Sequence, residues 1–115
     1  MARTNFLPLG SVVLLKNGLQ KLIIMGRALN VTKGGKEFYF DYVGVLFPQG
    51  LINEQVAYFN HDDIDRIYFT GYNDEGMREM TDIINDFVEK NPELNRCTAE
   101  EWEALGKEEA PAEAE

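Results

Sequence analysis

Short apolar runs alternate with polar turn signals over the first two-thirds of the chain, a pattern typical of antiparallel strands. The apolar runs at residues 12–16 and 19–25 are separated by Asn17-Gly18, and a tight hairpin turn favours residues that accept a positive φ. Gly26 predicts a bulge or bend in the second strand. Lys33-Gly34-Gly35-Lys36 predicts a second turn of the same kind.

The longest strand is predicted at residues 37–47, where both alternating faces are largely apolar. Such a strand lies centrally in a sheet or curves round a small barrel. Pro48-Gln49-Gly50 ends it, and two short strands follow at residues 56–59 and 66–70, on either side of a polar turn at residues 60–63. The pattern predicts an α+β fold: a small five-stranded antiparallel sheet or SH3-like barrel, followed by helices.

The apolar period changes from two residues to a helical spacing after Gly71, which predicts an amphipathic helix at about residues 73–90. Asn73 or Asp74 caps its start, and Asn91-Pro92 ends it. One face carries all the large apolar residues, and we expect it to pack on the sheet; a helix that binds a partner in a groove is the alternative. These residues are Met77, Met80, Ile83, Ile84, Phe87 and Val88.

A short second helix is predicted at residues 99–105, because Thr98 and Glu101 form a capping-box pattern. The strands, at about residues 10–70, and both helices make a single α+β domain that covers residues 1–106. Residues 107–115 are an acidic, low-complexity tail that we expect to be disordered.

Charge is divided unevenly along the chain, whose net charge is −9. Six bases and three acids precede residue 61, whereas five bases and seventeen acids follow residue 60. An acidic half repels phosphate backbones and anionic lipids, so nucleic acid is an unlikely partner and a membrane is not expected. No apolar run approaches the roughly 20 residues of a membrane helix. The N-terminus does not resemble a secretory signal, and the single cysteine, Cys97, excludes an intrachain disulfide, which favours a cytoplasmic protein.

Side chains that carry chemistry are sparse, so we expect no enzyme, no catalytic residue and no cofactor. The one histidine, His61, is far in sequence from Cys97, and no nucleophile motif is present. The sequence from His61 to Asp65 is rich in carboxylates but lacks the spacing of a calcium loop, so we expect a turn and no metal site. Lys33–Lys36 lacks the strand–loop–helix context of a phosphate loop.

Three segments together resemble a family of small domain-of-unknown-function proteins of Gram-positive bacteria. Members are often encoded beside type VII (ESX-type) secretion systems and their LXG-domain toxins. The resemblance implies a cytoplasmic adaptor or chaperone that binds a cognate secreted protein, with no catalytic residues to carry over. The segments are residues 7–16 with 21–27, residues 40–50, and residues 59–65 through to 69–72.

An export signal is the other feature of such systems that the sequence can be checked for. Tyr58 and Asp62 fit the Tyr-x-x-x-Asp/Glu pattern, but they lie where a strand meets a turn, not after a helical hairpin. The Trp-x-Gly turn of secreted partners is also absent, because Glu103 and Ala104 follow Trp102. We therefore expect this chain to act on a secreted protein and not to be one.

The predicted function is binding to a protein partner, such as a secreted LXG-type toxin or an associated helical factor. Phe47, Tyr72 and Trp102 are the predicted contact residues, because aromatic side chains dominate binding energy at interfaces. An exposed strand edge offers a second mode of binding. Two alternatives remain: an acidic inhibitor or immunity-like protein that covers a basic toxin site, and a small barrel that binds nucleic acid through the basic first half.

Overall fold

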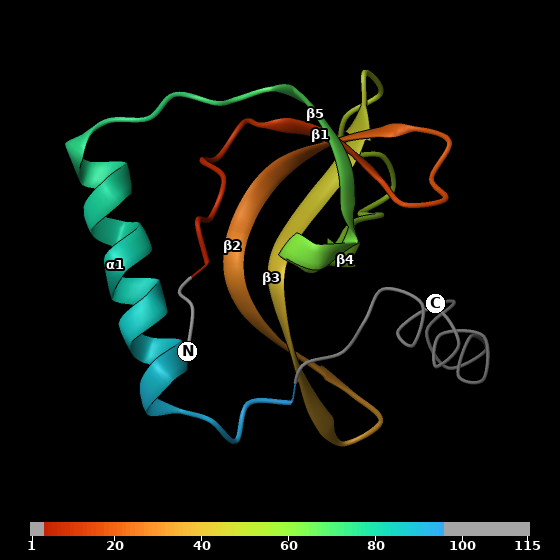
Figure 1. Cartoon of the computed structure of the whole chain (residues 1–115). Coiled ribbons are helices and arrows are strands. Elements are labelled where there is room, and N and C mark those ends of the chain that lie inside the picture. Colours follow the sequence, from red (N-terminus) through yellow and green to blue (C-terminus); the bar gives the residue numbers. More distant parts are fainter. Residues whose placement is uncertain (1–3, 96–115) are drawn as a thin grey trace.

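The computed structural model describes residues 4–95 and shows a curved antiparallel sheet with one long helix beside it (Figure 1). The strand order is β4-β3-β2-β1-β5, and the helix follows the last strand, which confirms the predicted α+β class. The predicted helix at 99–105 and the acidic tail at 107–115 lie outside the described residues. The elements are β1 (Val12–Leu15), β2 (Lys21–Lys33), β3 (Lys36–Phe47), β4 (Ala57–Phe59), the 3₁₀ helix η1 (His61–Asp63), β5 (Ile64–Phe69) and α1 (Glu75–Lys90).

The long β2–β3 hairpin forms the centre of the sheet. Its turn is closed by Gly34 and Gly35, with φ values of 61° and 79°, and Lys33 is paired with Lys36, as the sequence predicts. The register shifts by one residue between Ile24 and Gly26, which confirms the bulge predicted at Gly26. A long, twisted hairpin with a bulge curves strongly, and Figure 1 shows this curvature.

Eight consecutive residues of β3, from Phe38 to Val45, are buried. This confirms that both faces of the strand are covered. On one side Tyr42 packs in the main core with the rings of Phe6 and Phe59. Phe40 belongs to a second, smaller cluster and stacks on Tyr58 at a centroid distance of 5.3 Å.

The two edge strands, β4 and β5, are joined by only four residues, Asn60 to Asp63. The predicted polar turn here is η1, in which the Asn60 N–H donates to Asp63 Oδ2 (2.8 Å) and the Asp63 N–H donates to the Asn60 carbonyl (2.9 Å). The Lys16 N–H donates to the Asp63 carbonyl (2.8 Å) and fixes η1 to the end of β1. Because so short a connection links opposite edges, the sheet has to curl until its edges approach one another.

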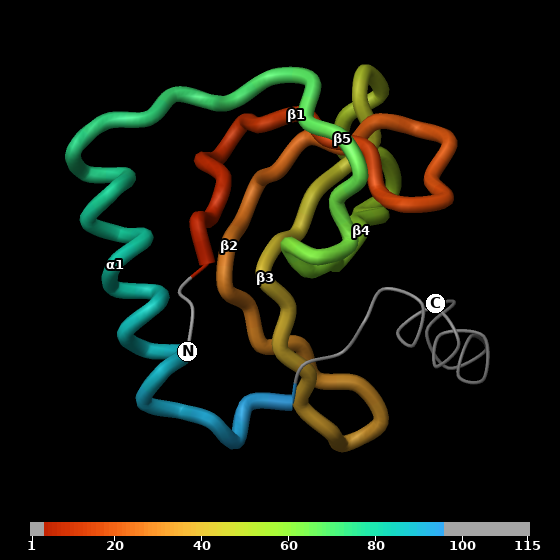
Figure 2. The backbone as a smooth tube through the Cα atoms, in the orientation of Figure 1, coloured from red at the N-terminus to blue at the C-terminus, as the bar shows by residue number. Residues whose placement is uncertain are grey.

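An extended N-terminal segment, residues 4–9, lies between α1 and the sheet (Figure 2). The Thr4 N–H donates to Asn85 Oδ1 (3.0 Å), and Asn85 Nδ2 donates to the Thr4 carbonyl (2.9 Å). On the other side, the Leu7 N–H donates to Tyr42 Oη (2.9 Å). This segment therefore links the helix to the sheet, but it does not cover all of the helix. Ile84 joins the core cluster of the sheet and Val88 packs against it, so part of the apolar face packs as expected. The expectation does not hold for Met80, Ile83 and Phe87, which are about half exposed.

The N-terminal segment is held at its other end by a close approach of backbone at Gly71. The Gly71 N–H donates to Ser11 Oγ (3.0 Å), and the Ser11 hydroxyl donates to the Pro8 carbonyl (2.8 Å). A Cβ atom at Gly71 would overlap the carbonyl oxygen of Leu9. Only glycine fits between these two chain segments, so Gly71 fixes where the chain leaves the sheet toward α1.

Candidate functional site

The buried face of α1 is narrow. Asp74 caps the helix by accepting a hydrogen bond from the Met77 N–H (2.9 Å), which selects one of the two predicted caps. Only Ile84 and Asn85 are buried, and Asn85 uses its side chain to bind the N-terminal segment. Since the N-terminal segment and the core around Ile84 cover only this narrow side, most of the helix surface is left exposed.

Three large apolar residues of α1 form an exposed surface, which we call the helix stripe: Met80, Ile83 and Phe87. Their exposed fractions are 49%, 57% and 45%. Steps of three and four residues place them on one side of the helix. Single exposed apolar residues are common, but an aligned set on one helix is typical of an interaction surface.

A groove of about 310 Å³ runs from the helix stripe to β2. Met80 lines it from the helix, while Leu9 and Met25 line it from the N-terminal segment and from β2. Both of these residues are about half exposed. Methionine is unbranched and adapts its shape, so a groove lined by three methionines accommodates apolar side chains of different sizes. Further lining comes from Gly26, Arg27, Gly76, Met77 and Ile84.

An acidic row follows the helix stripe on the solvent side of α1. We define it as the exposed residues Glu75, Glu79, Asp82 and Asp86, which are spaced by four, three and four residues. Three stripe residues directly follow a member of the row, so the row lies about 100° round the helix from the stripe. The site therefore combines an apolar surface with a negative border, and such a border attracts a positively charged partner surface.

The predicted contact residues lie in different places. Phe47, at the end of β3, is 40% exposed, and Tyr72, which follows β5, is 78% exposed. Trp102 lies outside the described residues. Phe47 is paired with Lys21, whose ammonium lies 5.1 Å from the ring centre of Tyr68 on β5. On β5 the residues Ile67, Tyr68 and Phe69 are also exposed, and their side chains alternate between the two faces of the strand.

The helix stripe is the part of the site that sequence reasoning missed, although its members were recognised as an apolar pattern. A signal was present in Thr81 and Asn85, two hydrogen-bonding residues four positions apart on the helix. Arg27 Nη1 donates to Thr81 Oγ1 (2.8 Å), so this polar side of α1 faces the body of the protein. A polar pair at helical spacing beside an apolar stripe indicates that the stripe itself is turned partly outward.

His61 has a structural role beside Tyr42. Tyr42 Oη and His61 Nδ1 share a hydrogen bond of 2.7 Å, and the His61 N–H donates to Oδ2 of the buried Asp41 (2.9 Å). Burial raises the pKa of the Tyr42 hydroxyl well above its ordinary value, and nearby Asp41 raises it further; the Leu7 N–H and Arg27 act in the opposite direction. The neutral hydroxyl is thus the form that the fold retains.

Among residues 4–95, no group of three or more His, Cys, Asp or Glu side chains is placed to hold a metal ion. Nor does that part of the chain contain a helix with the length and apolarity to span a membrane. The basic residues of the first half are dispersed. Burial lowers the pKa of Arg27, which is bound to α1, Lys21 lies against Tyr68, and Lys33 and Lys36 are at the hairpin turn.

The fold and its surfaces define a small α+β domain built on a strongly curved antiparallel sheet. A family model, Domain of unknown function (DUF4176), matches residues 6–80, and the chain belongs to this family. The match begins in the N-terminal segment, covers all five strands and ends within α1 at the first stripe residue, Met80. No curated protein and no solved structure gives a significant match to the chain.

Proposed function

We propose that this protein is a non-catalytic adaptor or chaperone that binds a protein partner through the helix stripe and the adjoining groove. The observation that supports this is the half-exposed set of Met80, Ile83 and Phe87 on a helix whose other face is already fixed. A partner would bury these side chains without any rearrangement of the sheet. Such an apolar, preformed helix face is one side of a helix-in-groove interface.

The chemistry of the site favours an amphipathic helix with basic residues along one border of its apolar face. Its apolar side chains fill the groove between Met25 and Met80, and its lysines or arginines meet the acidic row. Charge pairs at the rim of an interface contribute mainly to the rate and specificity of association. Apolar burial at the stripe supplies most of the affinity.

The resemblance to proteins encoded beside type VII secretion systems supports a particular partner class. In this proposal the partner is the helical part of an LXG-type toxin, or a helical factor that accompanies it, and the complex forms in the cytoplasm before export. Phe47 and Tyr72 remain predicted contacts for a second part of the partner, because both are exposed.

The direct test is co-purification with the LXG-domain protein encoded beside this chain's gene, followed by titration of the purified pair. Ile83→Lys introduces a charge into the centre of the stripe and is expected to weaken binding at least about tenfold, as for a central interface residue. The control is Leu19→Lys, the same kind of change at a residue that is 97% exposed on the β1–β2 connection. Equal affinity of both variants, or no complex at micromolar concentration, would contradict the proposal.

An inhibitor of a basic toxin site is the second candidate, because the acidic row suits it as well. The two functions differ in the role of the apolar stripe. Replacing Glu79 and Asp86 by lysine is expected to abolish an inhibitor that acts by charge, whereas an adaptor loses mainly association rate and salt dependence. Toxin activity in a purified assay separates them, since an adaptor need not suppress it.

A further inference from the structure

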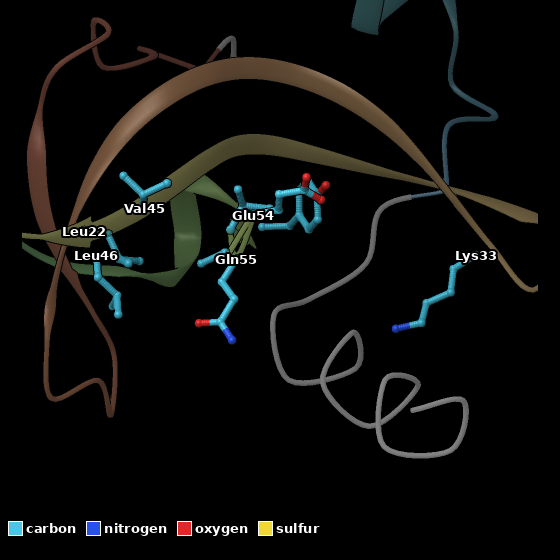
Figure 3. Close-up of a pocket in the computed structure, with 9 residues that line it drawn as sticks. Leu22, Lys33, Val45, Leu46, Glu54 and Gln55 are labelled. Atoms are coloured by element: carbon cyan, nitrogen blue, oxygen red, sulfur yellow. The ribbon is translucent and has the colours of Figure 1, made fainter. Parts of the chain in front are cut away.

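A second cavity lies at the β4 end of the sheet, away from α1, and we call it the β3–β4 pocket. Its volume is about 500 Å³. Figure 3 shows Leu22, Val45 and Leu46 gathered at one end of it and Lys33 at the other, with the loop that precedes β4 between them. Val56 and Tyr58 also line it. The pocket is apolar at the end formed by Leu22, Val45 and Leu46, and its size accommodates a large aromatic side chain.

The described chain ends on the strand edge that leads to this pocket. The Tyr39 N–H donates to the Asn95 carbonyl (2.8 Å), and Asn95 Nδ2 donates to the Glu37 carbonyl (3.2 Å). Farther along the same edge of β3, Tyr42 to Gly44 are paired with the strand β4. Tyr58 of the pocket stacks on Phe40, the residue next to Tyr39. The described chain therefore ends, at Asn95, beside the part of β3 that adjoins the pocket wall.

We propose that the β3–β4 pocket is occupied by the chain's own C-terminal segment, with Trp102 as the buried side chain. Trp102 is seven positions after Asn95, which gives it a reach of up to about 23–25 Å from the end of the described chain. Trp102 carries the largest apolar surface outside the described residues. Its neighbours Glu100, Glu101 and Glu103 suit the Lys33 end of the pocket, although Glu54 at the middle opposes them.

This inference is independent of the helix stripe. In this proposal Trp102 fills a pocket of its own chain, whereas the sequence predicts that Trp102 contacts a partner. The acidic C-terminal segment is then held against the sheet by one aromatic anchor. A partner that binds the helix stripe leaves this contact intact, so either proposal can fail while the other holds.

Trp102 is the only tryptophan, so the fluorescence of the unmodified full-length protein reports its environment directly. Excitation at the red edge avoids the tyrosines. A blue-shifted emission, with most of the acrylamide quenching lost relative to the urea-unfolded chain, is the expected result. Emission and quenching equal to those of the unfolded chain would overturn the proposal. Protection that grows with protein concentration would also overturn it, because the pocket would then hold Trp102 of a second copy.

The pocket is tested with Val56→Glu, which places a carboxylate in the pocket wall beside the acidic segment. It is expected to shift the emission to the red and restore quenching, while far-ultraviolet circular dichroism stays unchanged. Leu19→Glu makes a matched change at an exposed position outside the pocket and is expected to leave the emission unaltered. A protected Trp102 that Val56→Glu does not expose would place the side chain elsewhere and contradict the assignment.

A measurement without a pocket variant moves the single cysteine past Trp102 (Cys97→Ser with Ala104→Cys) and attaches a nitroxide spin label there, because Cys97 itself is only two residues from Asn95, which is already bound to β3. The amide signals of Leu46, Ala57 and Tyr58 are expected to broaden strongly, while those of the distant α1 residues Ile83 and Phe87 do not. Uniform weak broadening over all of these amides would show that the segment does not stay at the pocket, and the proposal would fall.

Discussion

β3 and α1 both carry long apolar patterns, and the structure uses them in opposite ways. All eight residues from Phe38 to Val45 are buried, whereas Ile84 is the only large apolar residue of α1 that is. The difference arises from what lies on each element. Strands and core side chains cover β3 on every side, whereas α1 is covered along one narrow side, by the N-terminal segment and by the core cluster around Ile84. The spacing of apolar residues thus predicts whether an element is a strand or a helix. The segments packed against that element determine how much of its apolar surface stays exposed to a partner.

The largest expected effect lies in the core around β3. Phe59→Ala removes a fully buried ring that stacks on Tyr42, and truncation of this kind costs about 3–5 kcal/mol. Urea denaturation should show the loss in the free energy of unfolding. Leu51→Ala, at an exposed residue, is the control and is expected to change stability by less than about 0.5 kcal/mol. Similar midpoints for both variants would show that β3 is not the stabilising centre.

A smaller effect is expected where the chain passes from sheet to helix. Gly71→Ala forces a methyl group against the Leu9 carbonyl, and overpacking of this kind costs about 1–3 kcal/mol. Gly76→Ala is the matched change inside α1, where the new Cβ meets only Asp74 Oδ1 at 3.5 Å. It should stabilise the protein by up to about 1 kcal/mol because alanine favours a helix. Thermal unfolding of the two variants measures whether each substitution raises or lowers stability. An unchanged stability of Gly71→Ala would contradict the close approach of the Leu9 carbonyl.

Alkaline pH tests the buried hydroxyl that connects β3 to the N-terminal segment. The pKa of Tyr42 is raised in the folded state, so the contribution of the neutral form is complete below about pH 10 and decreases as the pH rises further. Each pH unit above that value removes up to about 1.4 kcal/mol. Tyr42→Phe lacks this term, and its stability difference from wild type should shrink with rising pH. Parallel pH profiles would show that Tyr42 is not responsible.

The smallest effect on stability is expected at the helix stripe, where the largest effect on binding is proposed. Ile83→Lys alters a side chain that is already mostly exposed, so the free energy of unfolding should change by about 0.5 kcal/mol or less. The same denaturation assay used for Phe59→Ala makes the comparison direct. A loss of several kcal/mol would mean that the stripe belongs to the core after all.

Local features of the fold were predictable because each depends on neighbouring residues in the sequence. The two-glycine turn of the β2–β3 hairpin, the bulge at Gly26 and the Asp74 cap all follow from short-range backbone preferences. The route of residues 4–9 was not predictable, because it is set by hydrogen bonds such as Thr4 to Asn85, between residues 81 positions apart. No local pattern records such a pairing.

The candidate site was only partly predictable from the sequence, because its residues follow local patterns but their exposure depends on contacts between distant segments. Choosing aromatic side chains found Phe47 and Tyr72, which are exposed but lie in different places. The helical period found Met80, Ile83 and Phe87 but assigned them to the core. Placing them correctly required knowing that an N-terminal segment lies beside α1 and leaves only Ile84, with Val88 next to it, in the core that α1 shares with the sheet.

The pairing of Thr4 with Asn85 also has a consequence for when the site comes into existence. Thr4 binds a residue that is synthesised 81 positions later, so α1 cannot take its place during synthesis until Asn85 has been added to the chain. A nascent or truncated chain lacks the complete groove, since Leu9 and Met80 come from segments that meet only in this final step. A partner that binds this groove therefore binds the folded protein and not a partly synthesised chain.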